Sequence, residues 1–231
     1  MTFTKRADGR KFDELREMKA DVGVIPRADG SARFQIGKTI AYAAVYGPRN
    51  LFPKFLQNSE QALLRCNYNM MSFSGAGERV RPGPSRRSRE ISFITQHALL
   101  PTLDLGDFPN SVVDVYIELL QTDAGTRCAG ITAAALALAD AGFLMKDLVS
   151  AVSMGFIDGK ILVDIDGYED MEVGVTDIPI ALMPRTGQIT LLQMDGCLKK
   201  DELKEVIRIA RKACHYIYSI QQEALKARYK K

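Results

Sequence analysis

The chain has 231 residues, of which 46% are hydrophobic and 26% charged, and it carries a formal net charge of +3 with an isoelectric point of about 8.6. This length suits one or two domains. This isoelectric point is below the value of about 9 or more that is typical of a domain that binds nucleic acid through its overall charge. Any contact with nucleic acid must therefore come from local clusters of basic residues.

The cysteines, the histidines and the distribution of apolar residues argue against several further classes of protein. The four cysteines lie far apart without a CxxC pair, which disfavours zinc and redox motifs and predicts mostly reduced, buried thiols in a cytoplasmic protein. The two histidines, His97 and His215, have no nucleophile nearby in sequence, so we expect no histidine-based triad. The charged first 19 residues do not resemble a signal peptide, and the most apolar run, 131–145, is too short to span a membrane.

The first part of the chain predicts an arm followed by strands. Residues 1–16 are polar and predict an extended N-terminal arm. The next segments predict an antiparallel meander of three strands, with Asp29-Gly30 as a turn signal, over 19–26, 31–36 and 39–46. A further strand is expected over 62–73, before a loop of glycines, prolines and arginines over 74–88. A helix is then expected from about 88 to 100, capped by Ser85 or Ser88.

The remaining elements complete the prediction of the fold class. A β-branched run over 112–120 predicts a strand, and the small apolar residues over 128–145 predict a buried helix. Four more strands follow, with a hairpin signal within each pair, over 149–156, 160–165, 178–183 and 188–193. An amphipathic C-terminal helix is expected over 201–227. This order predicts an α+β fold, with helices packed on mixed, mainly antiparallel sheets, in a single domain over 1–231.

The turn between the strand over 112–120 and the helix after it predicts a phosphate site. Gly125 lets the backbone approach a ligand, and the start of a helix offers unpaired N–H groups. Thr126 adds a hydroxyl donor, and Arg127 adds a planar fork that matches two phosphate oxygens. The alternative is an ordinary strand-to-helix turn with a permissive glycine and a surface arginine.

A second candidate site is the carboxylate-rich loop before the strand over 178–183. It contains five acidic residues, and the last of them immediately precedes the strand: Asp166, Glu169, Asp170, Glu172 and Asp177. Such a cluster can hold Mg²⁺ or Mn²⁺, which prefer oxygen ligands, and one member can act as a general acid. The alternative is an acidic, solvated hairpin loop.

A third candidate is the arginine-rich segment over 79–89. Its positive charges can follow the phosphate backbone of a nucleic acid, and Tyr68 and Phe73 are close enough in sequence to offer stacking faces. The alternative is a flexible surface loop. Together, the phosphate turn, the carboxylates and the basic segment predict a nuclease that uses phosphate as the nucleophile, with a metal ion or an acid stabilising the leaving oxygen.

Seven short segments also carry a family resemblance: Arg6-Ala7-Asp8-Gly9-Arg10, Ala28-Asp29-Gly30-Ser31-Ala32, Ala44-Val45-Tyr46-Gly47-Pro48, Pro84-Ser85-Arg86-Arg87, Leu120-Gln121-Thr122-Asp123-Ala124-Gly125-Thr126-Arg127, Ala135-Leu136-Ala137-Leu138-Ala139-Asp140-Ala141-Gly142 and Asp177-Ile178-Pro179. Over almost its whole length the chain resembles the RNase PH-like catalytic subunits of archaeal exosomes. The resemblance implies a fold of two βαβ-like halves. It also implies a phosphorolytic 3′-to-5′ exoribonuclease of the nucleotidyltransferase class, which is reversible and can add nucleotides from diphosphates.

The resemblance also implies roles for individual residues. Inorganic phosphate, as a co-substrate, would bind at the family's phosphate turn, which here is Gly125, Thr126 and Arg127. The two acidic active-site positions, which act as ligands of Mg²⁺ or Mn²⁺ or as a proton donor, match Asp170 and Asp177, with Asp177 favoured for the role. The arginines that hold RNA match Arg86 and Arg87 at the 3′ end, with Arg65 at a further position.

The implied partners are single-stranded RNA, an inactive RNase PH-like paralogue that alternates with this subunit in a six-membered ring, and RNA-binding cap subunits. No association with a membrane is implied. Two features depart from the family's pattern. The spacing from Asp170 to Asp177 is one residue longer than expected, and Asn67 stands where a second arginine is expected. Two other functions stay open: a non-catalytic RNA-binding ring subunit, and a homohexameric RNase PH that processes transfer RNA.

Overall fold

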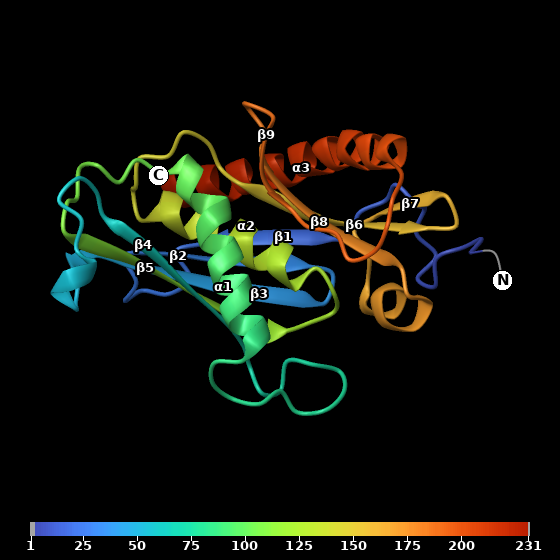
Figure 1. Cartoon of the computed structure of the whole chain (residues 1–231), viewed down its shortest axis with the longest axis horizontal. Helices are drawn as coiled ribbons and strands as arrows, with labels where there is room; N and C mark the ends of the chain where they lie inside the picture. Colours follow the sequence, from blue (N-terminus) through green and yellow to red (C-terminus); the bar gives the residue numbers. More distant parts are fainter. Residues whose placement is uncertain (1–2, 231) are drawn as a thin grey trace.

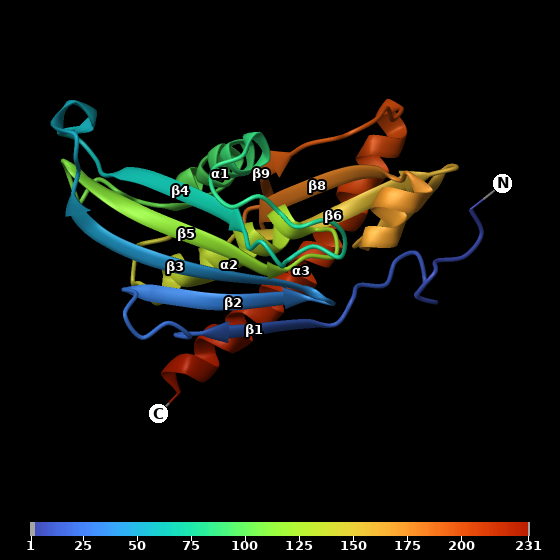
Figure 2. The same ribbon diagram turned by 90° about the horizontal axis from the view of Figure 1, so that it is seen from below.

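The computed structural model describes residues 3–230, apart from the side chain of Glu172, and in this range it contains two β-sheets and three α-helices (Figure 1). The first sheet has five strands in the order β1-β2-β3-β5-β4, and the second has four in the order β7-β6-β8-β9. Figure 2 shows the two sheets side by side, with the N-terminal arm beside the second. The predicted α+β fold class is confirmed.

The first three strands form the predicted antiparallel meander: β1 (Met18–Val22), β2 (Gly30–Ile36) and β3 (Thr39–Asn50). The strand β5 (Ser111–Gln121) pairs antiparallel with β3 on the far side of the meander. Alternating small and apolar side chains of these strands face one side of the sheet, so this side is buried under helices.

A βαβ unit completes the first sheet. The edge strand β4 (Leu63–Met70) is parallel to β5, and a parallel pair requires a crossover connection, which here contains α1 (Arg86–Leu99). Ser85 caps α1: its hydroxyl accepts from the N–H of Ser88, and the Ser88 hydroxyl accepts from the N–H of Ser85. One short 3₁₀ turn, η1 (Lys54–Leu56), precedes β4, and another, η2 (Leu100–Thr102), follows α1 within the crossover.

The strands described in the second sheet all pair antiparallel: β6 (Ser150–Ile157), β7 (Lys160–Val163), β8 (Thr176–Met183) and β9 (Gln188–Leu192). The βαβ character is therefore confined to the first half of the described chain. The predicted hairpin at Asp158-Gly159 is confirmed, with both residues at positive φ. Between β7 and β8 the acidic loop contains a π-helical turn, η3 (Glu169–Val173).

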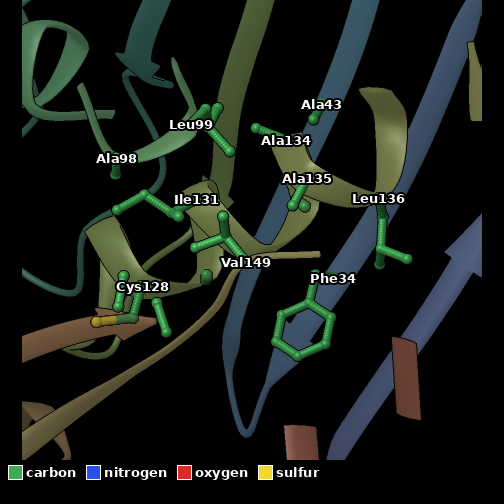
Figure 3. Close-up of a cluster of buried hydrophobic side chains, with 14 of the residues drawn as sticks. Phe34, Ala43, Ala98, Leu99, Cys128, Ile131, Ala134, Ala135, Leu136 and Val149 are labelled. Atoms are coloured by element: carbon green, nitrogen blue, oxygen red, sulfur yellow. The ribbon is translucent and has the colours of Figure 1, made fainter. Parts of the chain in front are cut away.

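The helix α2 (Thr126–Asp140) lies between the two sheets and packs against β2 and β3 on one side and β6 on the other. Twelve of its 15 residues are buried, which its small side chains permit. Figure 3 shows Cys128, Ile131 and Leu136 among the core side chains of this region. The long helix α3 (Lys200–Tyr229) packs across β1 and β6, so it also joins the two halves.

Three element ends differ from the predictions by four residues or more. The first strand ends at Val22 rather than Pro26, because Gly23 turns the chain with φ of 73°. The third continues past Gly47-Pro48 to Asn50, with a change of register that lets the pairing with β5 resume. The buried helix ends at Asp140 rather than Met145, since Gly142 has φ of 80° and cannot continue it.

The cysteines largely follow the prediction. Cys66, Cys128 and Cys214 are buried, and burial raises the pKa of each thiol, whereas Cys197 is exposed. Within residues 3–230, no helix combines the length and the apolar character that crossing a membrane requires.

Candidate active site

The turn between β5 and α2 has an unusual backbone. Ala124 and Gly125 both lie in the left-handed region, with φ of 52° and 62°, and Gly125 directly precedes the first residue of α2. A Cβ atom on Gly125 would lie 3.2 Å from Nη2 of Arg16, which is closer than most real contacts. Both the conformation and the space at this position therefore favour glycine.

Contacts from distant segments hold this turn in place. Thr39 on β3 accepts a hydrogen bond from the N–H of Asp123 at 2.9 Å and donates one to the carbonyl of Ala124 at 2.8 Å. On the other side, the N–H of Gly167 donates to Asp123 Oδ1 at 3.0 Å. The first N–H groups of α2 have no acceptor inside the helix, and this fixed turn presents them at a defined place.

A buried ion pair lies directly behind the turn. Arg16 donates from Nε and Nη2 to the two carboxylate oxygens of Asp164, at 2.9 and 2.7 Å, and its Nη1 donates to the carbonyl of Asp123. Burial alone would lower the pKa of Arg16, but the hydrogen bonds and charge of Asp164 outweigh it and raise that pKa. Arg16 therefore stays charged and links the turn to the start of the acidic loop.

Beside the turn lies a cavity of about 400 Å³ with a mostly polar and charged wall. Its lining residues come from the starts of α1 and α2, from η3, from β8 and from the segment after β9: Arg87, Glu90, Arg127, Asp170, Asp177, Pro179, Gln193, Met194 and Asp195. The structure thus brings together four predicted site residues, which are Arg87, Arg127, Asp170 and Asp177. Arginines and carboxylates face one space, as binding both an anion and a cation would require.

Asp177 is a carboxyl group of this wall whose pKa is raised above its ordinary value. Burial raises its pKa, the nearby Asp170 raises it further, and Arg127, Arg87 and a hydrogen bond from Ser153 oppose the rise without cancelling it. A carboxyl group with a raised pKa holds a proton more readily than an exposed one. Asp177 therefore has the property that a general acid needs, at the start of a rigid strand.

Arg127 is oriented by a neighbour that also lines the cavity. Its Nη1 donates to Oε1 of Gln193 at 2.6 Å. This single neutral contact fixes the guanidinium plane and leaves the other N–H groups of the fork for an anion. Gln193 follows β9 and was not among the residues predicted from the sequence.

The other two residues of the phosphate turn lie next to the cavity rather than in its wall. Gly125 faces Arg16 and the Cβ atom of Ser153, the residue that donates to Asp177. Thr126 is buried, and its hydroxyl lies near Tyr68 of β4. Both residues therefore lie next to the residues of the charged wall without lining the cavity themselves.

The structure does not bring Arg86 and Arg65 to this cavity. Arg86 is exposed on α1, where successive residues point in different directions, and of the two adjacent arginines only Arg87 reaches the wall. Arg65 lies on the opposite face of the sheet, because side chains alternate along β4, and it pairs there with Asp114. Their assignment to RNA stays a prediction.

The start of α1 carries an unfavourable charge pattern. Arg86, Arg87 and Arg89 occupy its first turn, at the positive end of the helix dipole, and no acidic residue offsets them in that turn. Such a pattern destabilises a helix unless an anion binds close by. The pattern is therefore consistent with a phosphate-containing ligand between the starts of α1 and α2.

The carboxylates of the wall fit a divalent cation that also binds a substrate. Among the described residues, no group of three histidine, cysteine or acidic side chains is arranged to hold a metal. Mg²⁺ and Mn²⁺ are often bound by one or two carboxylates, with substrate phosphates and water as further ligands. Asp170 and Asp177 match that donor set, and the carboxylates outnumber the arginines in the wall, so a cation would offset the charge of a bound phosphate.

The acidic loop is not the solvated hairpin that was the alternative prediction. Glu169 is fully buried, and both of its oxygens accept hydrogen bonds at 2.7 Å from Arg6 of the N-terminal arm. Arg6 also donates to the carbonyl oxygens of Val163 and Asp164. These contacts could not be predicted as a pair, because Arg6 and Glu169 are 163 residues apart. Charged residues within the Arg6–Arg10 segment were the one visible signal.

Family models match most of the chain. Residues 14–143 match domain 1 of the 3′ exoribonuclease family, and residues 147–213 match domain 2 of the same family. Two curated relatives, both named exosome complex component Rrp41, come from Thermococcus kodakarensis and Methanopyrus kandleri. They are 55% and 49% identical to this chain over 98% and 97% of its length, and the matches cover 90% and 93% of the relatives.

Two solved structures share the fold. Rice Rrp46 matches with a TM-score of 0.85 and 24% identity, over 96% of this chain and 100% of the other. The Archaeoglobus fulgidus exosome with RNA bound to the active site matches with a TM-score of 0.80 and 23% identity, over 98% and 93%. These identities support the fold alone, whereas the family models and the curated relatives establish the kinship. The chain belongs to the 3′ exoribonuclease family of RNase PH.

Proposed function

We propose that this chain is a phosphate-dependent 3′-to-5′ exoribonuclease and the catalytic subunit of an exosome ring. Family membership supports the exonuclease activity, and the relatives named exosome components support the assembly. One observation carries the chemistry: Arg127 at the start of α2 and Asp177 at the start of β8 line the same cavity. One substrate bound in this cavity can therefore contact both the anion site at Arg127 and the carboxyl group of Asp177.

Inorganic phosphate is the attacking group. It binds at the start of α2, where the N–H groups, the Thr126 hydroxyl and the Arg127 fork donate hydrogen bonds, while Gly125 lets it approach the backbone. A phosphate oxygen attacks the phosphorus of the last phosphodiester of RNA, and the bond to the 3′ oxygen of the preceding nucleotide breaks. The terminal nucleotide leaves as a nucleoside diphosphate whose β-phosphate was the inorganic phosphate.

Asp177 gives its proton to the departing 3′ oxygen. Its raised pKa keeps the proton available, and the hydrogen bond from Ser153 fixes the orientation of the carboxyl group. In the reverse direction, Asp177 accepts a proton from the 3′ hydroxyl, and a nucleoside diphosphate extends the RNA. Reversal requires no further residue.

The arginines outside the phosphate turn hold the RNA. Arg87 lines the cavity and pairs with the phosphates nearest the 3′ end, with Arg86 beside it on α1 and Arg65 further along the single strand. A Mg²⁺ or Mn²⁺ ion would be held by Asp170, and by Asp177 once that carboxyl has given up its proton, and it would neutralise phosphate charge there.

The assembly is a six-membered ring in which this subunit alternates with an inactive paralogue, under RNA-binding cap subunits. Some of the exposed large apolar side chains offer contact surface, among them Phe52 and Phe55 near η1 and Phe93 on α1. Single-stranded RNA reaches the cavity through the ring.

Product analysis tests the proposal. The chain is mixed with its paralogue and with single-stranded RNA, with and without inorganic phosphate, and the released nucleotides are separated. We expect nucleoside diphosphates that depend on added phosphate, and degradation slowed by about 10²–10⁴-fold with an Asp177→Asn variant in the same mixture. Monophosphate products formed without phosphate would refute phosphorolysis, and an unchanged rate in the variant would indicate a non-catalytic subunit.

A further inference from the structure

The hydroxyl group of Tyr68 is buried without a partner. Tyr68 lies on β4 with 4% of its surface exposed, and its Oη atom forms no hydrogen bond within the described part of the chain. Most buried polar side-chain groups in proteins are paired, and an unpaired one is destabilising. The unpaired hydroxyl of Tyr68 therefore indicates that a bound ligand supplies its hydrogen-bond partner.

The position of the Tyr68 ring is fixed by both neighbouring helices. On one side, the N–H of Tyr68 donates to the hydroxyl of Ser92 on α1 at 2.8 Å. On the other side, the ring packs so close to α2 that a Cβ atom on Gly130 would lie 3.6 Å from Cε2. The hydroxyl cannot move far to find another acceptor, since its ring is held between the two helices.

The groups around this hydroxyl are those of an anion site. Burial raises the pKa of Tyr68, while Thr126, Arg87 and Arg127 act in the opposite direction and lower it. Thr126 is the first residue of α2 and Arg87 the second residue of α1, so the hydroxyl lies near the starts of both helices. The Thr126 hydroxyl and the Arg87 guanidinium lie near Oη, but neither meets the geometry of a hydrogen bond with it. The two arginines place positive charge beside Oη, so a negatively charged acceptor suits it as the missing partner.

We propose that Oη of Tyr68 donates a hydrogen bond to an oxygen of a phosphate group bound between the starts of α1 and α2, beside Arg127 and Arg87. The proposal rests on the proposed function, because that function supplies two phosphate groups at this place. One is inorganic phosphate, and the other is the terminal phosphodiester of RNA. Both present the same kind of oxygen, and steady-state kinetics tells them apart.

The test is the Tyr68→Phe variant in the assembled complex, because phenylalanine keeps the ring and removes only the hydroxyl. The KM for inorganic phosphate, the KM for RNA and kcat are measured for the parent and the variant. We expect one of the two KM values to rise about tenfold, as loss of a hydrogen bond to a charged group requires. Without phosphate, the melting temperature should be unchanged or higher, because an unpaired buried hydroxyl is removed.

Tyr116→Phe is the matched control. Tyr116 lies on the neighbouring strand β5, on the opposite face of the sheet and partly exposed, and its variant should keep both KM values. A rise confined to phosphate assigns the contact to the attacking group, and a rise confined to RNA assigns it to the phosphodiester.

Unchanged KM values in Tyr68→Phe would overturn the contact, whatever happens to kcat, and would leave the hydroxyl to solvent in the adjoining cavity of about 210 Å³. Failure of the proposed function has a different signature, because the parent complex itself would then need no phosphate. The two failures are therefore distinguishable within one experiment.

Discussion

At the scale of single residues, the burial of Asp177 affects both catalysis and the stability of the fold. Burial helps it hold a proton for transfer, but the same burial makes its ionised form unfavourable in the folded protein. The native state therefore binds this proton more tightly than the unfolded chain does. The free energy of unfolding should fall as the pH rises from the unfolded pKa near 3.8 through the higher folded pKa.

Replacing Asp177 with asparagine should separate these two effects. The Asp177→Asn side chain can still accept the hydrogen bond from Ser153 but carries no charge, so we expect a higher melting temperature than the parent at pH 7. The difference should shrink toward pH 4. Activity should fall by about 10²–10⁴-fold, because no proton can be donated.

Asp170→Asn is the control, because Asp170 is exposed and its change to asparagine should leave the melting temperature near that of the parent. Thermal unfolding between pH 4 and pH 7 measures both variants. A lower melting temperature for Asp177→Asn at pH 7 would contradict the role of burial.

The residues that were predicted from the sequence are those with local signals. Arg127 follows a glycine and a hydroxyl at a strand-to-helix turn, and Asp177 stands directly before a strand, so each stands out within a few positions. Arg16 and Gln193 escaped prediction because the groups they orient are brought near only by the fold: Arg16 pairs with Asp164, 148 residues away. No pattern within one segment could reveal such a pair.

At the scale of elements, the N-terminal arm and the acidic loop form one structural unit. Arg6 and Glu169 are both fully buried and joined by two hydrogen bonds of 2.7 Å. Glu169 begins η3, and Asp170 follows it, so the arm fixes the element that carries a wall residue of the cavity. We infer that the arm is required for the site as well as for the fold.

Arg6→Ala should lower the free energy of unfolding by about 3–5 kcal/mol, because it leaves the carboxylate of Glu169 buried without a partner. Chemical denaturation measures the loss. The double variant Arg6→Met with Glu169→Leu should recover much of the stability, since no buried charge then remains.

Lys204→Ala is the control for this prediction. It breaks an ion pair with Asp201 that is exposed on α3, so its effect should stay within about 0.5 kcal/mol. A similarly small effect for Arg6→Ala would show that the buried pair does not anchor the arm.

The kinds of element were predicted better than their ends and partners. Hydrophobic periodicity indicated the strands and helices, but α2 was predicted too long because its apolar run continues past Gly142 to Met145. The parallel pairing of β4 with β5 depends on where α1 crosses the sheet, which no periodicity records. Tertiary geometry decides such partners.

At the scale of the whole molecule, the two halves share one hydrophobic core. A single cluster of buried apolar side chains includes Phe34 of the first sheet, Ile131 of α2 and Ile180 of the second sheet. The family models divide the chain between residues 143 and 147, and the single domain over 1–231 stays our proposal on the strength of that common core. The active cavity depends on this packing, because its wall draws on both halves.

Transfer of labelled inorganic phosphate tests most directly the claim that a phosphate held at the start of α2 attacks RNA. The assembled complex is supplied with ³²P-labelled phosphate, and the parent is compared with Arg127→Ala and with Arg208→Ala, a control on the exposed face of α3. We predict that each released diphosphate carries the label in its β position. We also predict that Arg127→Ala alone needs at least about tenfold more phosphate for the same rate. Unlabelled products, or an unchanged phosphate requirement in Arg127→Ala, would contradict the account.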